Sequence, residues 1–285
     1  MSTSPAQDTP VDCYAVLGNP IAHSKSPEIH ALFAAQTQQH LRYEARLVAL
    51  GEFERALDEF QQQGGRGVNV TVPFKQEAWA AADSRSARAQ RAGAVNTLVF
   101  RADGSRYGDT TDGVGLVRDL SVNLGVQLIG KKLLLLGAGG AARGVLESLL
   151  AERPREVVIA NRTRANADRL VSGFAELGNV RACGLEALDG GSFDIVINAT
   201  AAGLQGEVPS LPDDLFAPQA CAYDLMYGNA PTAFMRWAQQ QQVGQVFDGL
   251  GMLVEQAAES FYLWRGVRPD TAPVIARLRH KPPRQ

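Results

Sequence analysis

The chain has 285 residues, of which 45% are hydrophobic, and its 28 Lys/Arg and 30 Asp/Glu residues give a formal net charge of −2. This length allows two domains with substantial cores. The balanced charge excludes the basic surface by which proteins usually bind nucleic acid or anionic membranes. No apolar run is long enough to span a membrane, and residues 1–10 lack the apolar core of a signal peptide. We therefore expect a cytoplasmic protein.

The cysteines and histidines do not form a metal-ligand pattern. Cys13, Cys183 and Cys221 are widely spaced, and the four histidines show no paired spacing with them or with each other. Cys13 and Cys221 lie in strand-like apolar runs, where cysteine usually acts as a small buried hydrophobic residue. The sequence predicts no metal site and no disulfide.

The first part of the chain alternates strand-like and helix-like segments, as in a small α/β domain. Ser26 is a candidate helix cap, with Pro27 at the first helical position and Glu28 in the first turn. The predicted strands are 13–17, 43–48 and 67–70, and the predicted helices start at Pro27 and span 52–63.

A glycine-rich turn follows the most apolar strand of the chain. Residues 133–136 are four leucines, which predicts a strand buried on both faces of a parallel sheet. The turn at 137–142 then opens a helix that ends near Ala151, and a second apolar run occupies 157–160. Glycines allow the backbone to approach a ligand, and a helix start attracts anions. The strand-helix-strand spacing favours a pyrophosphate site for a dinucleotide.

The residues after the second strand predict which dinucleotide binds. An acidic residue at this position would hold the ribose 2′-hydroxyl of NAD, but residues 161–164 are Asn-Arg-Thr-Arg. Two guanidinium groups and a hydroxyl favour a 2′-phosphate instead. We therefore predict NADP as the cofactor.

The remaining pattern predicts a doubly wound sheet and a return of the chain to its first domain. Further strands are expected at 194–198 and 222–225 and around 246–247, and a final helix at 251–264 should cross back onto the first domain. The predicted fold has two α/β domains with a substrate cleft between them: residues 1–112 with 249–285, and an NADP-binding Rossmann-type domain at 113–248. Gly113 and Gly249 are candidate hinges.

Polar clusters at strand ends in the first domain indicate where the chemistry takes place. Asn69 and Thr71 share a face of their strand, and Lys75 follows after a proline turn. Asn96-Thr97 and the 109–112 segment Asp-Thr-Thr-Asp each adjoin an apolar run. Amide, hydroxyl, amine and carboxylate groups together suit a substrate with several hydroxyls and one exchangeable proton.

Seven motifs in order resemble the shikimate dehydrogenase family, which includes the shikimate/quinate dehydrogenases. They are GNPIAHSKSPEIH (18–30), NVTVPFK (69–75), AGAVNT (92–97), DTTDGVG (109–115), GAGGAARG (137–144), NRT (161–163) and GMLVEQA (251–257). The resemblance implies the reversible NADPH-dependent reduction of 3-dehydroshikimate to shikimate in aromatic amino-acid biosynthesis.

The resemblance also implies roles for individual residues. Lys75 and Asp112 would form the catalytic pair, with Lys75 supplying or relaying a proton to the ketone oxygen. Whether Lys75 also serves as the base of the reverse reaction stays open, because burial and Asp112 act on it in opposite directions. The implied substrate-binding residues are Ser24, Ser26, Asn69, Thr71, Asn96, Tyr227 and Gln256. The implied cofactor-binding residues are Gly137, Ala138, Gly139, Gly140, Ala141, Asn161, Arg162, Thr163, Arg164, Thr200, Leu225, Gly249 and Met252.

Three positions depart from the family pattern. Ala201 stands where the family usually has serine, Asn166 stands where it typically has a second phosphate-binding arginine, and Leu225 replaces a methionine that would face the nicotinamide. We expect weaker or altered NADP binding, with Arg164 acting from a different angle.

Two alternative functions remain at this stage. A quinate/shikimate dehydrogenase that prefers NAD would be expected to carry an acidic residue within 162–164, which this chain lacks. A non-catalytic sensor of NADP and a cyclic hydroxy acid would have no need of both Lys75 and Asp112. The expected partner is the small-molecule substrate, not nucleic acid or membrane; the oligomeric state is not fixed by the sequence, and a homodimer is retained as one candidate.

Overall fold

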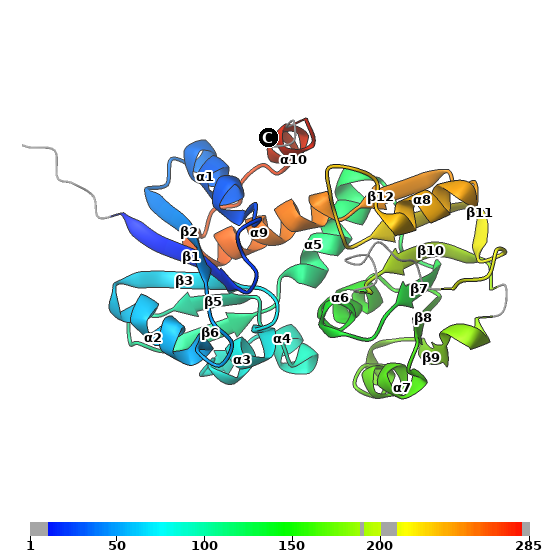
Figure 1. Cartoon of the computed structure of the whole chain (residues 1–285), viewed down its shortest axis with the longest axis horizontal. Helices are drawn as coiled ribbons and strands as arrows, with labels where there is room; N and C mark the ends of the chain where they lie inside the picture. The colour runs from blue at the N-terminus through cyan, green and yellow to red at the C-terminus, as the bar shows by residue number, and fades with distance from the viewer. Residues whose placement is uncertain (1–10, 189–190, 201–209, 281–285) are drawn as a thin grey trace, which may run out of the picture.

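The computed structural model describes residues 11–188, 191–200 and 210–280, which form two lobes that each contain a six-stranded sheet (Figure 1). Helices pack on the faces of both sheets, so the predicted class of two α/β units is confirmed. In the described residues, every helix is too short or too polar to cross a bilayer. The same residues contain no group of three or more His, Cys, Asp or Glu side chains placed to hold a metal.

The first sheet is mixed and has the strand order β2-β1-β3-β5-β6-β4. Its parallel part matches the predicted strands: β1 (Asp12–Gly18), β2 (Leu41–Leu47) and β3 (Gly65–Val70). The other three strands were not predicted: β5 (Thr97–Phe100) pairs antiparallel with β3 and β6, and β4 (Ser84–Arg85) pairs parallel with β6 (Arg106–Asp109). These strands have two to four residues each, too few to show a periodic pattern.

Helices α1 (Ser26–Thr37), α2 (Phe53–Gln62), α3 (Lys75–Ala80) and α4 (Ala87–Ala92) belong to the first lobe. The expected cap of α1 was wrong, because Lys25 occupies the cap position and Ser26 is already helical. The backbone N–H of Ser26 instead donates to Ser24 Oγ at 3.3 Å. This contact places both serine side chains at the entrance of α1.

The second sheet is entirely parallel, with the order β12-β11-β10-β7-β8-β9. Taken along the chain, this is the doubly wound order 3-2-1-4-5-6 of dinucleotide-binding domains. The four leucines of β7 are fully buried, as their continuous apolar run predicts. The strands are β7 (Lys132–Leu136), β8 (Glu156–Asn161), β9 (Val180–Gly184), β10 (Phe193–Asn198), β11 (Phe216–Asp224) and β12 (Gln245–Asp248). Its helices are α6 (Gly140–Ala151), α7 (Arg164–Ser172) and α8 (Ala233–Gln240), with 3-10 turns at Ala175–Leu177 and Leu185–Ala187.

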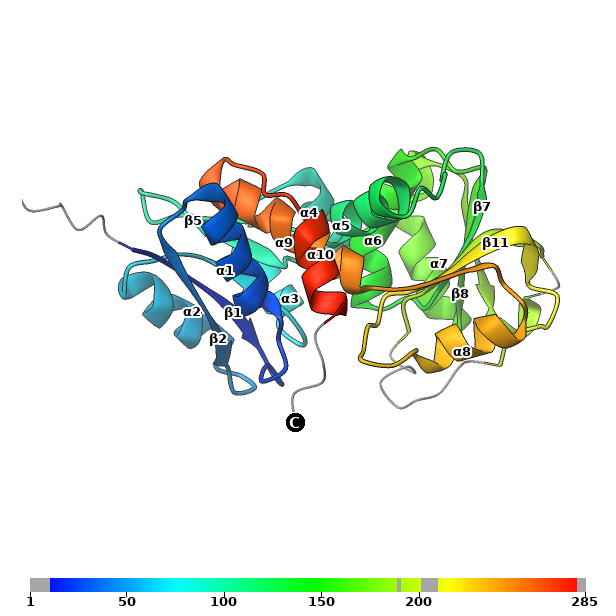
Figure 2. The same cartoon turned by 90° about the horizontal axis from the view of Figure 1, so that it is seen from above.

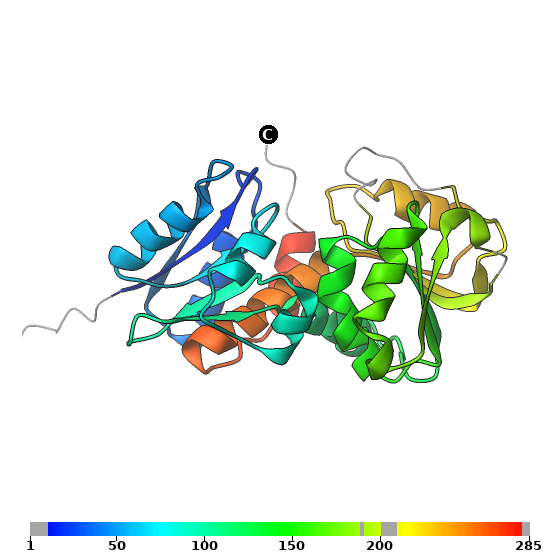
Figure 3. The ribbon, with the colours of Figure 1, turned by 90° about the horizontal axis from the view of Figure 1, so that it is seen from below.

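Two helices connect the lobes and cross each other closely. Helix α5 (Asp112–Arg118), extended by a π turn at Asp119–Asn123, leads into the second lobe. Helix α9 (Leu250–Arg265) returns from it and packs against α1, as expected, and α10 (Ala272–Arg279) follows (Figure 2). Seen from below, α4 of the first lobe faces α6 of the second (Figure 3), and Arg91 on α4 pairs with Glu147 on α6 at 3.1 Å.

Candidate active site

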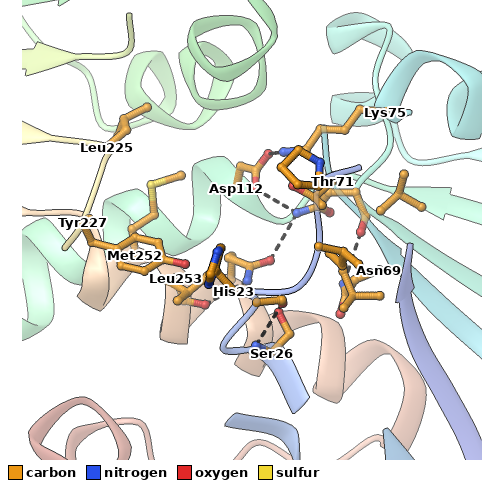
Figure 4. Close-up of a pocket in the computed structure, with 18 residues that line it drawn as sticks. His23, Ser26, Asn69, Thr71, Lys75, Asp112, Leu225, Tyr227, Met252 and Leu253 are labelled. Carbon is orange, nitrogen blue, oxygen red and sulfur yellow. Dashed lines mark hydrogen bonds and ion pairs between the residues drawn. The ribbon is translucent and has the colours of Figure 1, made fainter. Parts of the chain in front are cut away.

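A cavity of about 400 Å³ lies between the lobes and is lined by residues from both (Figure 4). Its first-lobe wall comes from the ends of β1 and β3 and the segments that follow them. The opposite wall comes from the segment after β11 in the second lobe and from the start of α9, which connects the lobes. Twelve predicted site residues line it: Ser24, Ser26, Asn69, Thr71, Lys75, Asn96, Asp112, Leu225, Tyr227, Gly249, Met252 and Gln256.

Lys75 and Asp112 form an ion pair at the cavity wall. Lys75 Nζ lies 2.6 Å from Asp112 Oδ2, and the side chains are 24% and 12% exposed, so the pair is mostly removed from solvent (Figure 4). Lys75 begins α3 and Asp112 begins α5, which brings together residues 37 positions apart. A Cβ added at Gly144 on α6 would lie 3.3 Å from Asp112 Oδ2, so the glycine lets the second lobe approach the carboxylate. The pair can therefore hold and pass a proton at the lobe boundary.

An amide network fixes the other oxygen of Asp112. Asn96 Nδ2 donates to Asp112 Oδ1 and to Thr111 Oγ1, both at 2.9 Å, and to Gln256 Oε1 at 3.3 Å. The Thr111 backbone N–H donates to Asn96 Oδ1 at 2.9 Å. Asn96 is 3% exposed and Gln256 comes from α9, so the network joins both connecting helices to the first sheet.

Asn69 is the centre of a second buried network beside the cavity. Its Nδ2 donates to Asn96 O, Thr97 Oγ1 and Ser260 Oγ at 3.0–3.2 Å, and its Oδ1 accepts from Tyr43 OH at 2.7 Å. Ser260 is 191 residues away in sequence, on α9. The network holds the Asn69 side chain at the cavity wall.

The segment after β11 is held by a buried carboxylate that the sequence analysis did not single out. Asp224 accepts hydrogen bonds from Asn198 Nδ2 at 3.1 Å, Met226 N at 3.1 Å and Thr232 Oγ1 at 2.5 Å. Burial raises the pKa of Asp224 above its usual value, and these hydrogen bonds oppose that shift. Asp224 thereby fixes the turn that directs Leu225 and Tyr227 at the cavity.

The glycine-rich turn has the features that a dinucleotide phosphate needs. Gly137 has φ +101°, a backbone angle that only glycine adopts readily, and it lies against Thr200. A Cβ at Gly139 or Gly140 would meet no atom within 4 Å, so the backbone faces open space. The cap position of α6 is Gly139, which has no side chain to occupy the first N–H groups of the helix. The residues present therefore fit a bound pyrophosphate, and Ala138 and Ala141 flank the same turn.

The arginines after β8 differ in their partners. Arg164 reaches Asp168 at 3.6 Å, and Arg169 donates a hydrogen bond to Asn166 Oδ1. Arg162 is exposed, and its guanidinium has no ion pair or hydrogen bond within the described residues. Asn161 Nδ2 donates to Thr163 O at 2.8 Å, which closes the turn that carries Arg162. Ala201, which departs from the family pattern, lies outside the described residues.

Six further residues of the cavity wall have no role predicted from the sequence. They are Val16, Pro20, Ile21, His23, Val70 and Leu253. Most are apolar, and sequence alone gives no reason to distinguish them from core residues. Pro20, Ile21, His23, Val70 and Leu253 do lie inside the quoted family motifs, which was the available signal.

A fully buried histidine stands behind this wall. His30 is 0% exposed, and its ring nitrogens are buried with no hydrogen-bond partner of good geometry among the described residues. Burial lowers the pKa of His30 to about 3. Because an unfolded chain binds this proton near pH 6.5, acidification below that pH favours unfolding by about 1.4 kcal/mol per pH unit until the folded pKa is reached.

We predict that wild type loses about 2 kcal/mol more stability than His30→Leu between pH 7.5 and pH 5. Urea unfolding at both pH values measures this difference, in which other titrating groups cancel. His40→Leu makes the same change at an exposed position and should follow wild type. Parallel pH dependences for wild type and His30→Leu would contradict a neutral buried imidazole.

The doubly wound sheet, the open glycine turn and the Lys75–Asp112 ion pair in a shared cavity define the class of protein: a two-domain, dinucleotide-dependent dehydrogenase. Three family models match successive parts of the chain. They describe a shikimate dehydrogenase substrate binding domain (residues 16–98), a shikimate/quinate 5-dehydrogenase (120–205) and a shikimate 5′-dehydrogenase C-terminal domain (249–279).

Named relatives and solved structures agree with these models. A shikimate dehydrogenase (NADP(+)) from Alkalilimnicola ehrlichii is 60% identical, over 94% of this chain and 98% of that relative. A Thermus thermophilus shikimate 5-dehydrogenase, solved with NADP(H) and shikimate, is 36% identical with a TM-score of 0.83, over 94% of this chain and 99% of that one. The Ael1 enzyme from Pseudomonas putida is 49% identical with a TM-score of 0.90, over 94% and 98%. The chain belongs to the shikimate dehydrogenase family, as its motifs indicated.

Proposed function

We propose that this protein catalyses the reversible NADPH-dependent reduction of 3-dehydroshikimate to shikimate on the route to aromatic amino acids. The Lys75–Asp112 pair carries the proposal, because it sits in a cavity between a hydroxyl-lined lobe and a dinucleotide-binding lobe. The relatives named shikimate dehydrogenase (NADP(+)) support the same reaction and cofactor. They do not favour an NAD-preferring quinate enzyme or a non-catalytic sensor.

The first lobe supplies the groups that hold the substrate. Ser24 and Ser26, at the entrance of α1, are proposed to bind the carboxylate. The remaining polar side chains of the cavity are proposed to bind ring hydroxyls: Asn69, Thr71, Asn96, Tyr227 and Gln256. In this assignment the substrate-binding domain consists of residues 1–112 and 249–285, and residues 113–248 form the cofactor domain.

Proton transfer is assigned to the ion pair. NADPH supplies a hydride to the ketone carbon when it is bound. Lys75 Nζ donates its proton to the oxygen that gains negative charge, and the positive charge of the ammonium stabilises that oxygen beforehand. Asp112, held by Asn96, orients the amine by its hydrogen bond of 2.6 Å. In the reverse direction the same amine takes the proton back.

Arg162 is the residue proposed to select the phosphorylated cofactor. We predict that Arg162→Ala raises KM for NADPH by 10-fold or more, because a charged hydrogen bond contributes about 1.5–3 kcal/mol. KM for NADH, which lacks the 2′-phosphate, should change by less than about twofold. Steady-state kinetics with both cofactors measure the difference.

Arg181→Ala is the matched control for this prediction. It removes the same charge from the same lobe, but Arg181 pairs with Glu156 at the opposite end of the parallel strands. This variant should keep both KM values. An equal rise of KM for NADPH and NADH in Arg162→Ala would contradict a role in recognising the 2′-phosphate.

The function itself is tested by following NADPH oxidation with 3-dehydroshikimate, and NADP reduction with shikimate or quinate. A higher kcat/KM for NAD or for quinate would overturn the proposal. We also propose a cytoplasmic location, where this NADPH-consuming reaction would find its cofactor. A homodimer remains a proposal that light scattering on the purified protein tests.

A further inference from the structure

One phenol behind the cavity connects two of its polar side chains. Tyr43 lies on β2, the edge strand of the first sheet, and is not itself one of the cavity-lining residues. Its OH donates to Asn69 Oδ1 at 2.7 Å. Burial raises the pKa of Tyr43 well above its usual value, and a hydrogen bond with Ser26 opposes that shift. Tyr43 therefore remains a neutral donor over the working pH range.

The hydrogen bonds of Asn69 leave its side-chain oxygen as the atom that can bind a substrate. Both Nδ2 hydrogens are directed at protein acceptors: Asn96 O, Thr97 Oγ1 and Ser260 Oγ. Oδ1 has two lone pairs, of which Tyr43 OH engages one. The other lone pair can accept a hydrogen bond from a ligand hydroxyl. Without Tyr43 OH, Oδ1 would lose the donor that holds it, and the amide would be held only through the hydrogen bonds of Nδ2.

The Tyr43 ring is fixed by an aromatic cluster. His30 stacks on it with ring centroids 4.1 Å apart and planes 9° from parallel. Trp264, on α9, lies beside both rings: its ring centroid is 5.4 Å from that of His30 and 6.2 Å from that of Tyr43. Ser26 and His30 are four residues apart on α1 and so share a helix face. The neutral imidazole thus packs flat against the Tyr43 ring and keeps the phenol OH within hydrogen-bonding distance of Asn69.

We propose that Tyr43 is a positioning residue for substrate recognition: held by the His30 ring, its phenol fixes the side-chain amide of Asn69 so that Oδ1 accepts from a substrate hydroxyl. The inference rests on the proposed function through the assignment of Asn69 to the substrate. The proposal adds a residue outside the cavity wall to the substrate site, and it assigns the buried His30 the role of supporting the Tyr43 ring.

Tyr43→Phe tests the proposal because it removes one oxygen and keeps the stacked ring. The variant should raise KM for shikimate about tenfold, as expected for one lost hydrogen bond. The value of kcat should change by less than about threefold, because the hydrogen bond from Asn69 stabilises the bound substrate and the transition state equally. KM for NADP should not change, because Asn69 is not assigned to the cofactor. A fall in kcat with an unchanged KM for shikimate would overturn the proposal.

Tyr14→Phe is the matched control. Tyr14 is the register partner of Tyr43 on β1 and stacks on Trp264 at 4.6 Å, but its OH lies 3.3 Å from Arg265 and not at the cavity. It should leave KM for shikimate within about twofold. In the Asn69→Ala background, Tyr43→Phe should have no further effect on KM, whereas an additive effect would contradict action through Asn69.

A measurement without substrate separates this proposal from the proposed function. The side-chain amide resonances of Asn69 in ¹⁵N–¹H spectra, identified by their loss in Asn69→Ala, should shift and broaden in Tyr43→Phe and stay in place in Tyr14→Phe. Unchanged resonances in Tyr43→Phe overturn the positioning role. If wild type fails to turn over shikimate while these resonances respond, the proposed function is wrong and the positioning of Asn69 stands.

Discussion

Lys75→Ala is expected to lower kcat for 3-dehydroshikimate reduction by about 10²–10⁴-fold, the range attributed to a positioned general acid. The variant removes the ammonium group that lies 2.6 Å from Asp112 and faces the cavity. Substrate KM should change by less than about threefold, because most of the polar groups proposed to bind the substrate remain. Steady-state kinetics of NADPH oxidation, with substrate saturation curves, separate the two parameters.

Lys131→Ala provides the control for Lys75→Ala. Lys131 also forms an ion pair, with Asp194 at 3.3 Å, but it lies beside the start of β7, away from the cavity. It should retain wild-type kcat. Circular dichroism establishes whether Lys75→Ala is folded. A folded Lys75→Ala variant with kcat within threefold of wild type would remove Lys75 from the chemistry and leave the shared cavity without its assigned acid.

The cofactor lobe was predictable because each of its signals is local. A parallel strand buried on both faces must be apolar throughout, so residues 133–136 predict β7 without reference to the rest of the chain. The glycine turn and the arginine after β8 are likewise read from short segments. The NADP prediction from these residues agrees with the relatives named for NADP(+).

The half of the first sheet that contains β4, β5 and β6 could not be predicted, because its signals are not local. Strand β6 reads Arg-Tyr-Gly-Asp, and helix α5 has two glycines among seven residues, so local propensity opposes both assignments. Strand β6 forms because it pairs with β5 and β4, and α5 forms because it packs against α6 and the distant α9. The Tyr43–Asn69 contact was invisible for the same reason, since it joins two strands that do not pair with each other.

The crossing of α5 and α9 yields the second large expected effect: Gly115→Ala should destabilise the protein by about 2–3 kcal/mol. A Cβ at Gly115 would lie 2.7 Å from the backbone N of Gln256 and 2.9 Å from Met252 O. Because these atoms belong to the α9 backbone, the two helices must separate. Helix propensity alone would make alanine more stabilising than glycine by about 1 kcal/mol. A lower free energy of unfolding in Gly115→Ala would therefore show that the close contact with α9 outweighs helix propensity.

Gly115→Ala should also reduce activity, because Gln256 and Met252 line the cavity and would move with α9. We expect kcat/KM for shikimate to fall at least tenfold. Thermal unfolding of the same sample shows whether the protein is folded at the assay temperature, so that a loss of activity is not mistaken for unfolding. Gly173→Ala is the control: its Cβ would meet nothing closer than 3.6 Å, and its φ of −80° suits alanine. If Gly115→Ala were as stable and active as Gly173→Ala, the helix crossing could not be what aligns the two walls of the cavity.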